Sequence, residues 1–242
     1  MNEVPATIKA QLFSLLEELG KRHPYVSFDE IRNAAHVTWP DLRDDTLRHY
    51  LAEAPSRGIL HDAGRGWYSP LAEAAILPAA AVQQSIDLIS QAFPLLEFAC
   101  WSTVHWNPWL RHLVDRSTVF LSCDTVSLPT IHDFLKRRGL DSRANPSAAE
   151  IAKNPLGPET FVLRPRLAAT PGDGPIASVE QVIVDSWVEN KAFHLFDAAE
   201  LREASLAWVR QRRIQLPTLF RYLAARGGSK EDVFGDLSII AK

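Results

Sequence analysis

The hydrophobic positions near the start of the chain repeat at the spacing of helices. In residues 5–20, isoleucine and leucine recur every three or four positions, which predicts a helix that ends at Gly20. Residues 27–36 begin with Ser27 and carry Glu30 three positions later. That pairing is typical of a capping box, so a short second helix is expected there.

A third helix and a hairpin follow. Residues 41–58 predict a helix, and its inner face holds four apolar or aromatic side chains, Leu47, Tyr50, Leu51 and Ala54. The stretch RGILHDAGRGWYSP, residues 57–70, places two glycines around Arg65, between two flanks with strand composition. Because glycine permits positive φ, the chain can reverse there, which predicts a β-hairpin that presents Arg65 outward. Three helices followed by such a hairpin indicate a winged helix-turn-helix domain over residues 1–72.

The rest of the chain alternates between helical and strand-like segments and then becomes wholly helical. A connector rich in alanine and proline is expected at residues 70–82, and a second domain at 83–242. Its predicted strands are 97–104, 117–124 and 160–167. Its predicted helices are 85–93, 107–114, 128–139, 178–191, 198–213 and 216–228, with loops at 141–159 and 169–175. The prediction is an α+β fold: the winged helix-turn-helix, then a mixed α+β domain with a small sheet and a C-terminal helical pair.

Composition places the chain among soluble proteins with real cores. Hydrophobic residues make up 46% of its 242 residues, and no apolar run approaches the length of a membrane span. The first residues carry acids and lack the features of a signal peptide, so a cytoplasmic location is expected.

The charge is unevenly placed. Residues 1–76 hold eight Lys/Arg and eleven Asp/Glu, a net charge of −3, while the remainder holds eighteen of each. A face that binds DNA would therefore be a local arrangement of arginines on an acidic domain. Phosphate neutralisation supplies most non-specific affinity, so strong non-specific binding is not expected.

The third helix and the hairpin carry the candidate DNA-binding residues. If the apolar face of the helix points inward, then Arg43, Thr46, Arg48 and His49 lie at its N-terminal and outer positions. Arginine can pair with guanine in the major groove, and threonine or histidine can bond bases or phosphates. Arg65 can reach a minor groove or the backbone. The ordinary alternative is a solvated helix face with a polar turn, and winged helices also bind proteins.

No metal or cofactor site is predicted. Cys100, His105 and His112 lie in separate predicted elements, and packing or capping explains them better than zinc does. Cys100 and Cys123 are expected to be free thiols in a core. The chain contains no P-loop, dinucleotide fingerprint, nucleophile elbow or zincin motif, so no enzymatic activity is expected.

The sequence also contains one nuclease-like tripeptide and two basic runs. Glu189-Asn190-Lys191 matches the loose E-x-K fragment of many nucleases, but it falls at a predicted helix end rather than on a strand. Two basic runs are expected to be solvated helix ends that can add phosphate contacts: Lys136, Arg137 and Arg138 in one, and Arg210, Arg212 and Arg213 in the other.

Four segments, in order, resemble the AbiEi-type antitoxin and winged-helix transcriptional regulator family of type IV toxin–antitoxin systems. They are TLRHYLAEAPSRGILHDAGRGWYSP, ACWSTVHWNPWLRH, SVEQVIVDSWVENK and LPTLFRYLAARGG, and they span nearly the whole chain. His112 matches the histidine with which the second of these segments ends in the family. Glu180, Val184 and Asp185 match the glutamate and the Val-Asp pair of the third segment. The chain departs from the family at Gln181, where lysine is expected, and in its acidic N-terminal domain.

The resemblance implies a winged helix that represses its own operon. It also implies a C-terminal domain that antagonises a nucleotidyltransferase-like toxin, as in this group typically without a stable complex. The leading hypothesis is therefore a DNA-binding autoregulator and antitoxin of a type IV-like toxin–antitoxin or phage-defence system, with its own promoter as double-stranded DNA partner. It would involve no membrane, and a homodimer on DNA is one arrangement that it allows. The alternatives are a winged helix that binds protein, and a nuclease-like enzyme that uses Glu189 and Lys191.

Overall fold

The computed structural model describes residues 6–114 and 117–236 and divides into two compact units. The first contains the chain up to residue 75, residues 206–218 and the C-terminal end from 234. The second contains residues 76–205 and 219–233. The α+β class predicted from the sequence is confirmed, because the chain combines many helices with two small sheets. The return of residues 206–218 to the first unit was not part of the predicted domain division.

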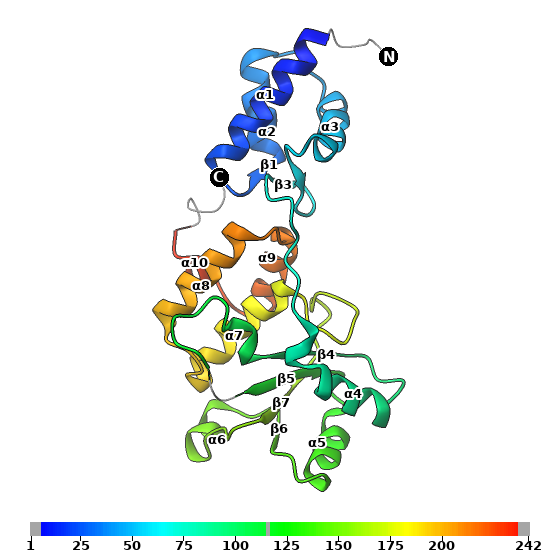
Figure 1. Cartoon of the computed structure of the whole chain (residues 1–242), viewed down its shortest axis with the longest axis vertical. Coiled ribbons are helices and arrows are strands. Elements are labelled where there is room, and N and C mark those ends of the chain that lie inside the picture. The colour runs from blue at the N-terminus through cyan, green and yellow to red at the C-terminus, as the bar shows by residue number, and fades with distance from the viewer. Residues whose placement is uncertain (1–5, 115–116, 237–242) are drawn as a thin grey trace. The chain divides into compact units, whose positions relative to one another are not determined.

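Three helices and three short strands follow one another closely in the described residues up to 75 (Figure 1). In chain order they are α1 (Ala6–Arg22), β1 (Val26–Ser27), α2 (Phe28–Thr38), α3 (Asp44–Glu53), a 3₁₀ turn (Ala54–Arg57), β2 (His61–Asp62) and β3 (Trp67–Ser69). Helix α1 runs two residues beyond Gly20, so the predicted end was wrong. Gly20 instead allows a close approach, because a Cβ there would lie 3.3 Å from side-chain atoms of Leu60 and Pro70.

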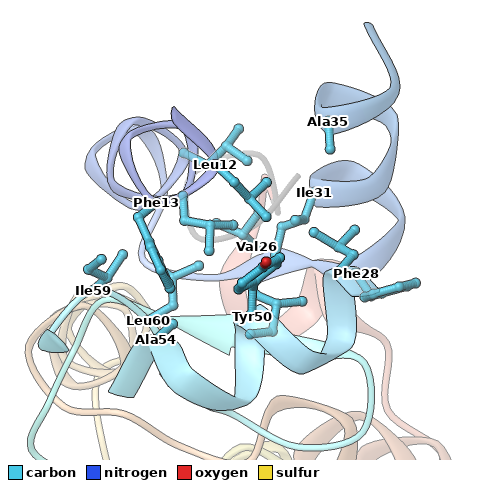
Figure 2. Close-up of a cluster of buried hydrophobic side chains, with 14 residues drawn as sticks. Leu12, Phe13, Val26, Phe28, Ile31, Ala35, Tyr50, Ala54, Ile59 and Leu60 are labelled. Carbon is cyan, nitrogen blue, oxygen red and sulfur yellow. The ribbon is translucent and has the colours of Figure 1, made fainter. Parts of the chain in front are cut away.

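A hydrophobic core packs α1, α2 and α3 together. Figure 2 shows side chains from α1, α2 and α3 converging with those that lead into the hairpin. Leu12, Ile31, Leu47 and Leu60 are fully buried. Ser27 caps α2 by accepting a hydrogen bond from the Glu30 amide at 3.1 Å, as the sequence pattern predicts.

The predicted hairpin is present and belongs to a three-stranded sheet. β2 pairs antiparallel with β3, and β1 pairs antiparallel with the other edge of β3, giving the order β1-β3-β2. The Ala63 amide donates to the Trp67 carbonyl, and the Trp67 amide donates to the Gly64 carbonyl, at 3.0 and 2.8 Å. Gly64 and Gly66 have φ of +102° and +75°, the positive values for which glycine is suited.

The second unit is built on a four-stranded sheet. In chain order its main elements are α4 (Gln83–Ala92), β4 (Phe98–Ser102), β5 (Thr118–Cys123), α5 (Leu128–Arg137), β6 (Ser142–Ala144), α6 (Ala148–Lys153), β7 (Thr160–Pro165) and α7 (Val179–Phe193). Two 3₁₀ turns, Ala79–Ala81 and Thr103–Trp106, precede α4 and follow β4. Three helices close the chain: α8 (Ala198–Gln211), α9 (Leu216–Ala225) and α10 (Lys230–Phe234).

Helices cover both faces of this sheet. Its strand order is β4-β5-β7-β6, with β5, β7 and β6 parallel and β4 antiparallel to β5. Residues such as Cys100, Leu121 and Leu163 pack with α4 and α5 on one face. The alternate residues face the other way, where Ser122 and Arg164 contact α7. The two faces of the central strands are therefore both buried, which explains why their sequences are almost uniformly apolar.

Two sequence predictions in this unit were wrong. Residues 107–114 form turns rather than a helix, because the Asn107 side chain bonds the backbone of Val114 through both its oxygen and its nitrogen. The predicted loop 141–159 contains β6 and α6. β6 forms through parallel pairing with β7, a non-local contact that leaves no periodic signal in so short a segment.

Within residues 6–114 and 117–236, no helix is both long and apolar enough to cross a membrane.

Candidate functional site

Helix α3 presents the side chains that the sequence singles out. It buries Leu47, Tyr50 and Leu51 and begins after Arg43, its N-cap residue. Arg43, Arg48 and His49 are exposed, and Thr46 is half-buried. These four side chains therefore lie on the part of α3 that turns away from the core, as its periodicity predicts.

Three of these residues already have local partners. The Arg43 guanidinium lies 3.7 Å from the Asp45 carboxylate. The Arg48 guanidinium stacks on the Phe28 ring, 3.9 Å from its centroid. Stacking fixes the plane of a guanidinium while its edge N–H groups stay free to donate. His49 meets the ring of Tyr50 edge-on, 5.6 Å between centroids. Arg48 is thus the most ordered of the exposed cations on α3.

Arg65 is the projecting residue of the hairpin. It is exposed and lies between the two glycines with positive φ. Among the described residues it makes no ion pair, so its charge is available to a ligand. The helix cations and Arg65 come from two elements that share the core of the first unit, which places them on one folded scaffold.

Most other cations of the first unit are neutralised by neighbouring carboxylates. Five such pairs have N–O distances between 2.9 and 3.8 Å: Lys9–Glu53, Lys21–Glu18, Arg32–Asp29, Arg32–Asp44 and Arg57–Glu53. Exposed pairs of this kind contribute little to stability. Their effect here is on the surface potential: among the described residues of this unit, the exposed arginines that make no ion pair are Arg22, Arg48, Arg65 and Arg210.

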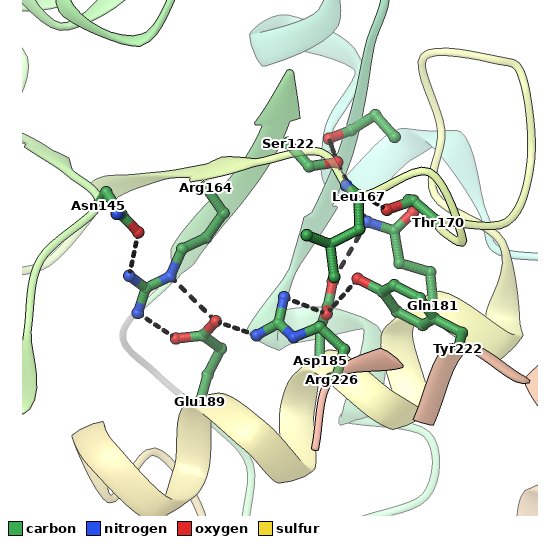
Figure 3. Close-up of polar contacts among 11 residues, drawn as sticks. Ser122, Asn145, Arg164, Leu167, Thr170, Gln181, Asp185, Glu189, Tyr222 and Arg226 are labelled. Carbon is green, nitrogen blue, oxygen red and sulfur yellow. Dashed lines mark hydrogen bonds and ion pairs between the residues drawn. The ribbon is translucent and has the colours of Figure 1, made fainter. Parts of the chain in front are cut away.

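The second unit contains a buried cluster of charged and polar side chains beneath helix α7 (Figure 3). Glu189 receives a two-point contact from Arg164 of β7, through Nε and Nη2 at 3.0 and 2.5 Å. Arg226 lies between the two carboxylates of α7. Its nitrogens are 2.8 Å from Glu189 and 3.0 Å from Asp185. The Glu189 side chain is only 2% exposed, so these charges are compensated almost without water.

Neutral groups complete the cluster around Asp185. The Tyr222 hydroxyl donates to Asp185 at 2.7 Å. The side-chain NH₂ group of Gln181 donates to Asp185 and to Ser122, both at 3.2 Å. Burial raises the pKa of Asp185, although Arg226 and the hydroxyl oppose that shift. Burial and the adjacent carboxylate also raise the pKa of Tyr222, so its hydroxyl stays a donor.

The cluster has the chemistry of a structural tie between elements. Two guanidinium groups balance two carboxylates, and the carboxylate oxygens are occupied by protein donors. The nuclease hypothesis needs Glu189 and Lys191 to act together, but Lys191 pairs with Asp232 at 3.0 Å. No group of three or more metal-ligating side chains occurs within the described part of the chain.

The residues weighed as zinc ligands have separate partners. The His105 ring accepts from the Ser102 amide and contacts the Pro78 carbonyl, both at 3.0 Å. The His112 ring lies 3.2 Å from Glu200. Another oxygen of that carboxylate accepts the amides of Arg111 and His112. These histidines therefore fix turns, one inside the unit and one at its surface.

The two cysteines should resist modification in the folded protein. Both are buried free thiols. Burial raises the pKa of Cys123 to about 12 and shifts that of Cys100 upward as well, so almost no reactive thiolate exists near pH 8. A thiol reagent should label neither residue under native conditions and both after denaturation. Rapid labelling of the native protein would contradict this prediction.

Burial of His105 should make the fold less stable in mild acid. Burial lowers the pKa of this ring below its usual value near 6.5. His105 then binds a proton more readily in the unfolded chain than in the folded one. Its contribution to the free energy of unfolding is complete above pH 6.5 and is lost as the pH falls. Denaturant titrations at pH 7.5 and 5.5 should show the lower free energy of unfolding at pH 5.5. An unchanged value, together with a His105 resonance that titrates near 6.5, would contradict this.

The basic runs have different surroundings. Lys136, Arg137 and Arg138 are exposed at the end of α5, with Arg138 above the Phe134 ring. Arg212 pairs with Glu73. Arg213 donates to the carbonyls of Leu71 and Ala72, both at 2.7 Å. Arg213 is therefore not a solvated residue at a helix end; its side chain bonds the backbone of the first unit.

A comparison with protein families identifies a match. The model of a family of unknown function, DUF6577, matches residues 46–237. No curated protein and no solved structure matches the chain. The matched stretch includes most of α3, the hairpin and the whole second unit, and it covers well over half of the 242 residues. The chain therefore belongs to this family of unknown function, DUF6577.

Proposed function

We propose that the protein is a DNA-binding transcriptional autoregulator and antitoxin, and that its N-terminal unit is a winged helix-turn-helix domain. The observation that carries the proposal is the order of elements in that unit. Helix α1, strand β1, helices α2 and α3 and the β2–β3 hairpin follow one another, and β1 pairs beside β3. In a domain of that type the helix at the position of α3 enters the major groove, and the hairpin is the wing.

The charges of this unit suit DNA recognition by few contacts. Arg48, held flat on Phe28, can offer its paired N–H groups to a guanine edge. Arg65 can contact the backbone or the minor groove, while Arg43, Thr46 and His49 lie beside Arg48 along α3. Because neighbouring carboxylates neutralise most other cations, one copy of the domain has little general attraction for phosphate. Specific sites would then require two copies on one duplex, or both units of one copy.

The antitoxin part rests on the sequence resemblance to AbiEi-type regulators. On that basis the second unit antagonises a nucleotidyltransferase-like toxin without forming a stable complex with it. A co-expression assay tests this directly: a toxin reading frame adjacent to the gene should arrest growth alone and not in the presence of this protein. Continued arrest would remove the antitoxin part while leaving DNA binding untouched.

The DNA-binding part is tested by a mobility-shift titration on the DNA upstream of the gene. The full chain should bind this DNA more tightly than a scrambled duplex, and the preference should persist across a salt series. Each phosphate contact contributes a slope of about −0.9 to the plot of log K against log salt, so a shallow slope is expected. Equal binding to both duplexes at every salt concentration would reject the proposal.

A protein-binding winged helix is the second candidate, and one observation favours it. Residues 1–76 carry a net charge of −3, and most of their cations pair with carboxylates. Such a surface resembles a general protein surface more than a nucleic-acid footprint. If the full chain binds neither duplex in the titration above, this candidate is favoured.

A further inference from the structure

The hairpin of the first unit contacts a distant part of the chain at its turn and just after its second strand. Residues 212–217 belong to the same compact unit as residues 1–75, although more than 130 residues separate them in the sequence. We infer that this segment, the clasp (residues 212–217), sets the pose of the hairpin and hence the contact of Arg65 with DNA. The inference rests on the proposed function and assigns positioning residues to it.

The clasp grips the hairpin at its tip. The Leu216 amide donates to the carbonyl of Ala63, the residue before the first tip glycine, at 3.0 Å. Gly64 packs directly on the clasp, because a Cβ there would lie 2.7 Å from Pro217 Cδ. A Cβ on Gly66, across Arg65, would meet no atom within 4 Å. The clasp therefore packs on the Gly64 side of the turn, while the Gly66 carbonyl on the other side accepts the Phe28 amide at 2.8 Å.

The clasp also fixes the strand that leaves the hairpin. The Arg213 guanidinium donates to the carbonyls of Leu71 and Ala72, two and three residues after β3. The Arg213 backbone bonds on both sides to Glu73 and Ala75, at 2.9 and 2.7 Å, in a short parallel bridge. Charge-assisted bonds to two successive carbonyls order a segment that has no regular structure of its own.

A buried tyrosine ties the clasp to the edge strand of the sheet. Tyr25 immediately precedes β1 and is fully buried. Its hydroxyl donates to the Arg212 carbonyl at 3.1 Å and accepts the Ile214 amide at 3.0 Å. Ile214 and Leu216 are buried as well. The clasp therefore contacts the turn, the exit strand and the edge strand, the three places that determine where the hairpin points.

The test compares Arg213→Ala with Arg212→Ala in the full chain. Both substitutions remove one positive charge from neighbouring positions, but the Arg212 side chain forms an exposed ion pair with the Glu73 carboxylate, whereas the Arg213 side chain donates to two backbone carbonyls. Affinity for the upstream DNA is measured over a salt series, at a temperature where circular dichroism shows each variant folded. Arg213→Ala should weaken binding about tenfold and reduce the magnitude of the salt slope by about 0.9, the loss of one phosphate contact. Arg212→Ala should change affinity less than threefold, on the order of an exposed charge.

A double-mutant cycle with Arg65→Ala separates positioning from general destabilisation. If the clasp acts through Arg65, then Arg213→Ala should cost almost nothing further in the Arg65→Ala background. Additive losses, or equal effects of Arg213→Ala and Arg212→Ala, would overturn the inference. If the wild-type chain binds no DNA, the proposed function fails and this inference falls with it. If the wild type binds and Arg213→Ala behaves like it, the inference alone fails.

Tyr25→Phe keeps the inference testable if Arg213→Ala does not fold. The substitution deletes one hydroxyl and keeps the buried ring. Amide exchange of Ala63 and Trp67, whose amides close the turn, should become faster, and affinity should fall as in Arg213→Ala. Unchanged exchange at both amides together with unchanged affinity would overturn the inference.

Discussion

Replacing Arg226 with alanine should lower the free energy of unfolding by about 3–5 kcal/mol, the cost of leaving buried carboxylates without their partner. Arg226 contacts both Asp185 and Glu189, and the two carboxylate side chains are 7% and 2% exposed. After the substitution Glu189 keeps Arg164, but Asp185 retains only neutral donors. Urea denaturation followed by circular dichroism measures the change, provided that the m-value stays constant.

An exposed ion pair of α7, the helix that carries Asp185 and Glu189, provides the control. Lys191 pairs with Asp232 at 3.0 Å, but both side chains are more than 40% exposed. Lys191→Ala should therefore change the free energy of unfolding by less than about 1 kcal/mol. Comparable losses in Arg226→Ala and Lys191→Ala would show that water reaches the cluster and that its charges are not buried in solution.

A combined substitution distinguishes pairing from packing. If unpaired charge causes the loss, then adding Asp185→Asn to Arg226→Ala should recover part of it, because the second change removes the uncompensated carboxylate. If lost packing by the arginine stem causes it, the double variant should be at least as unstable as the single one.

The elements predicted correctly from the sequence are those whose signals are local. The hairpin follows from two glycines at positions that need positive φ, and α2 from a serine cap that bonds the Glu30 amide. Helix α6 was missed although its own capping box, Ser147 with Glu150, lies in the sequence. The surrounding prolines and polar residues made that segment resemble a loop. β6 could not be found in this way, because its three residues depend on pairing with β7.

The buried cluster had a partial signal in the sequence. Gln181, Asp185 and Glu189 lie four residues apart, so they line one side of a helix whose other residues are mostly apolar. Polar side chains on a buried helix must find partners, so this spacing predicts a polar cluster. Their partners could not be predicted, since Arg164 and Arg226 come from a strand and a helix whose packing is a tertiary property.

The contacts of the clasp could not be predicted from the sequence either, because they too are tertiary. Arg212 and Arg213 look like the basic end of α8, and the helix dipole favours such residues there. Only the fold separates their roles, because one side chain pairs with an exposed carboxylate and the other bonds the exit of the hairpin. Adjacent residues of one type can therefore differ in function when the chain crosses between compact units.

Arg48→Ala should weaken binding to the preferred DNA by about 1–3 kcal/mol, or about 5- to 150-fold, if the arginine pairs with a guanine. The stacked guanidinium is pre-oriented on Phe28, so it loses little freedom on binding. The loss should be confined to sites that carry the recognised base, and affinity for scrambled DNA should change little. Titrations of specific and scrambled duplexes at matched salt measure the two effects.

Arg65→Ala and Arg48→Lys make the comparison selective. Arg65 lies at an exposed turn, so its loss should weaken binding to both duplexes alike and make the salt slope shallower by about 0.9. Arg48→Lys keeps the charge but removes the planar fork, so it should lose base preference while its salt slope stays near that of the wild type. If Arg48→Ala and Arg65→Ala both bind DNA as the wild type does, the N-terminal unit takes no part in DNA recognition. The protein-binding alternative would then account better for its surface.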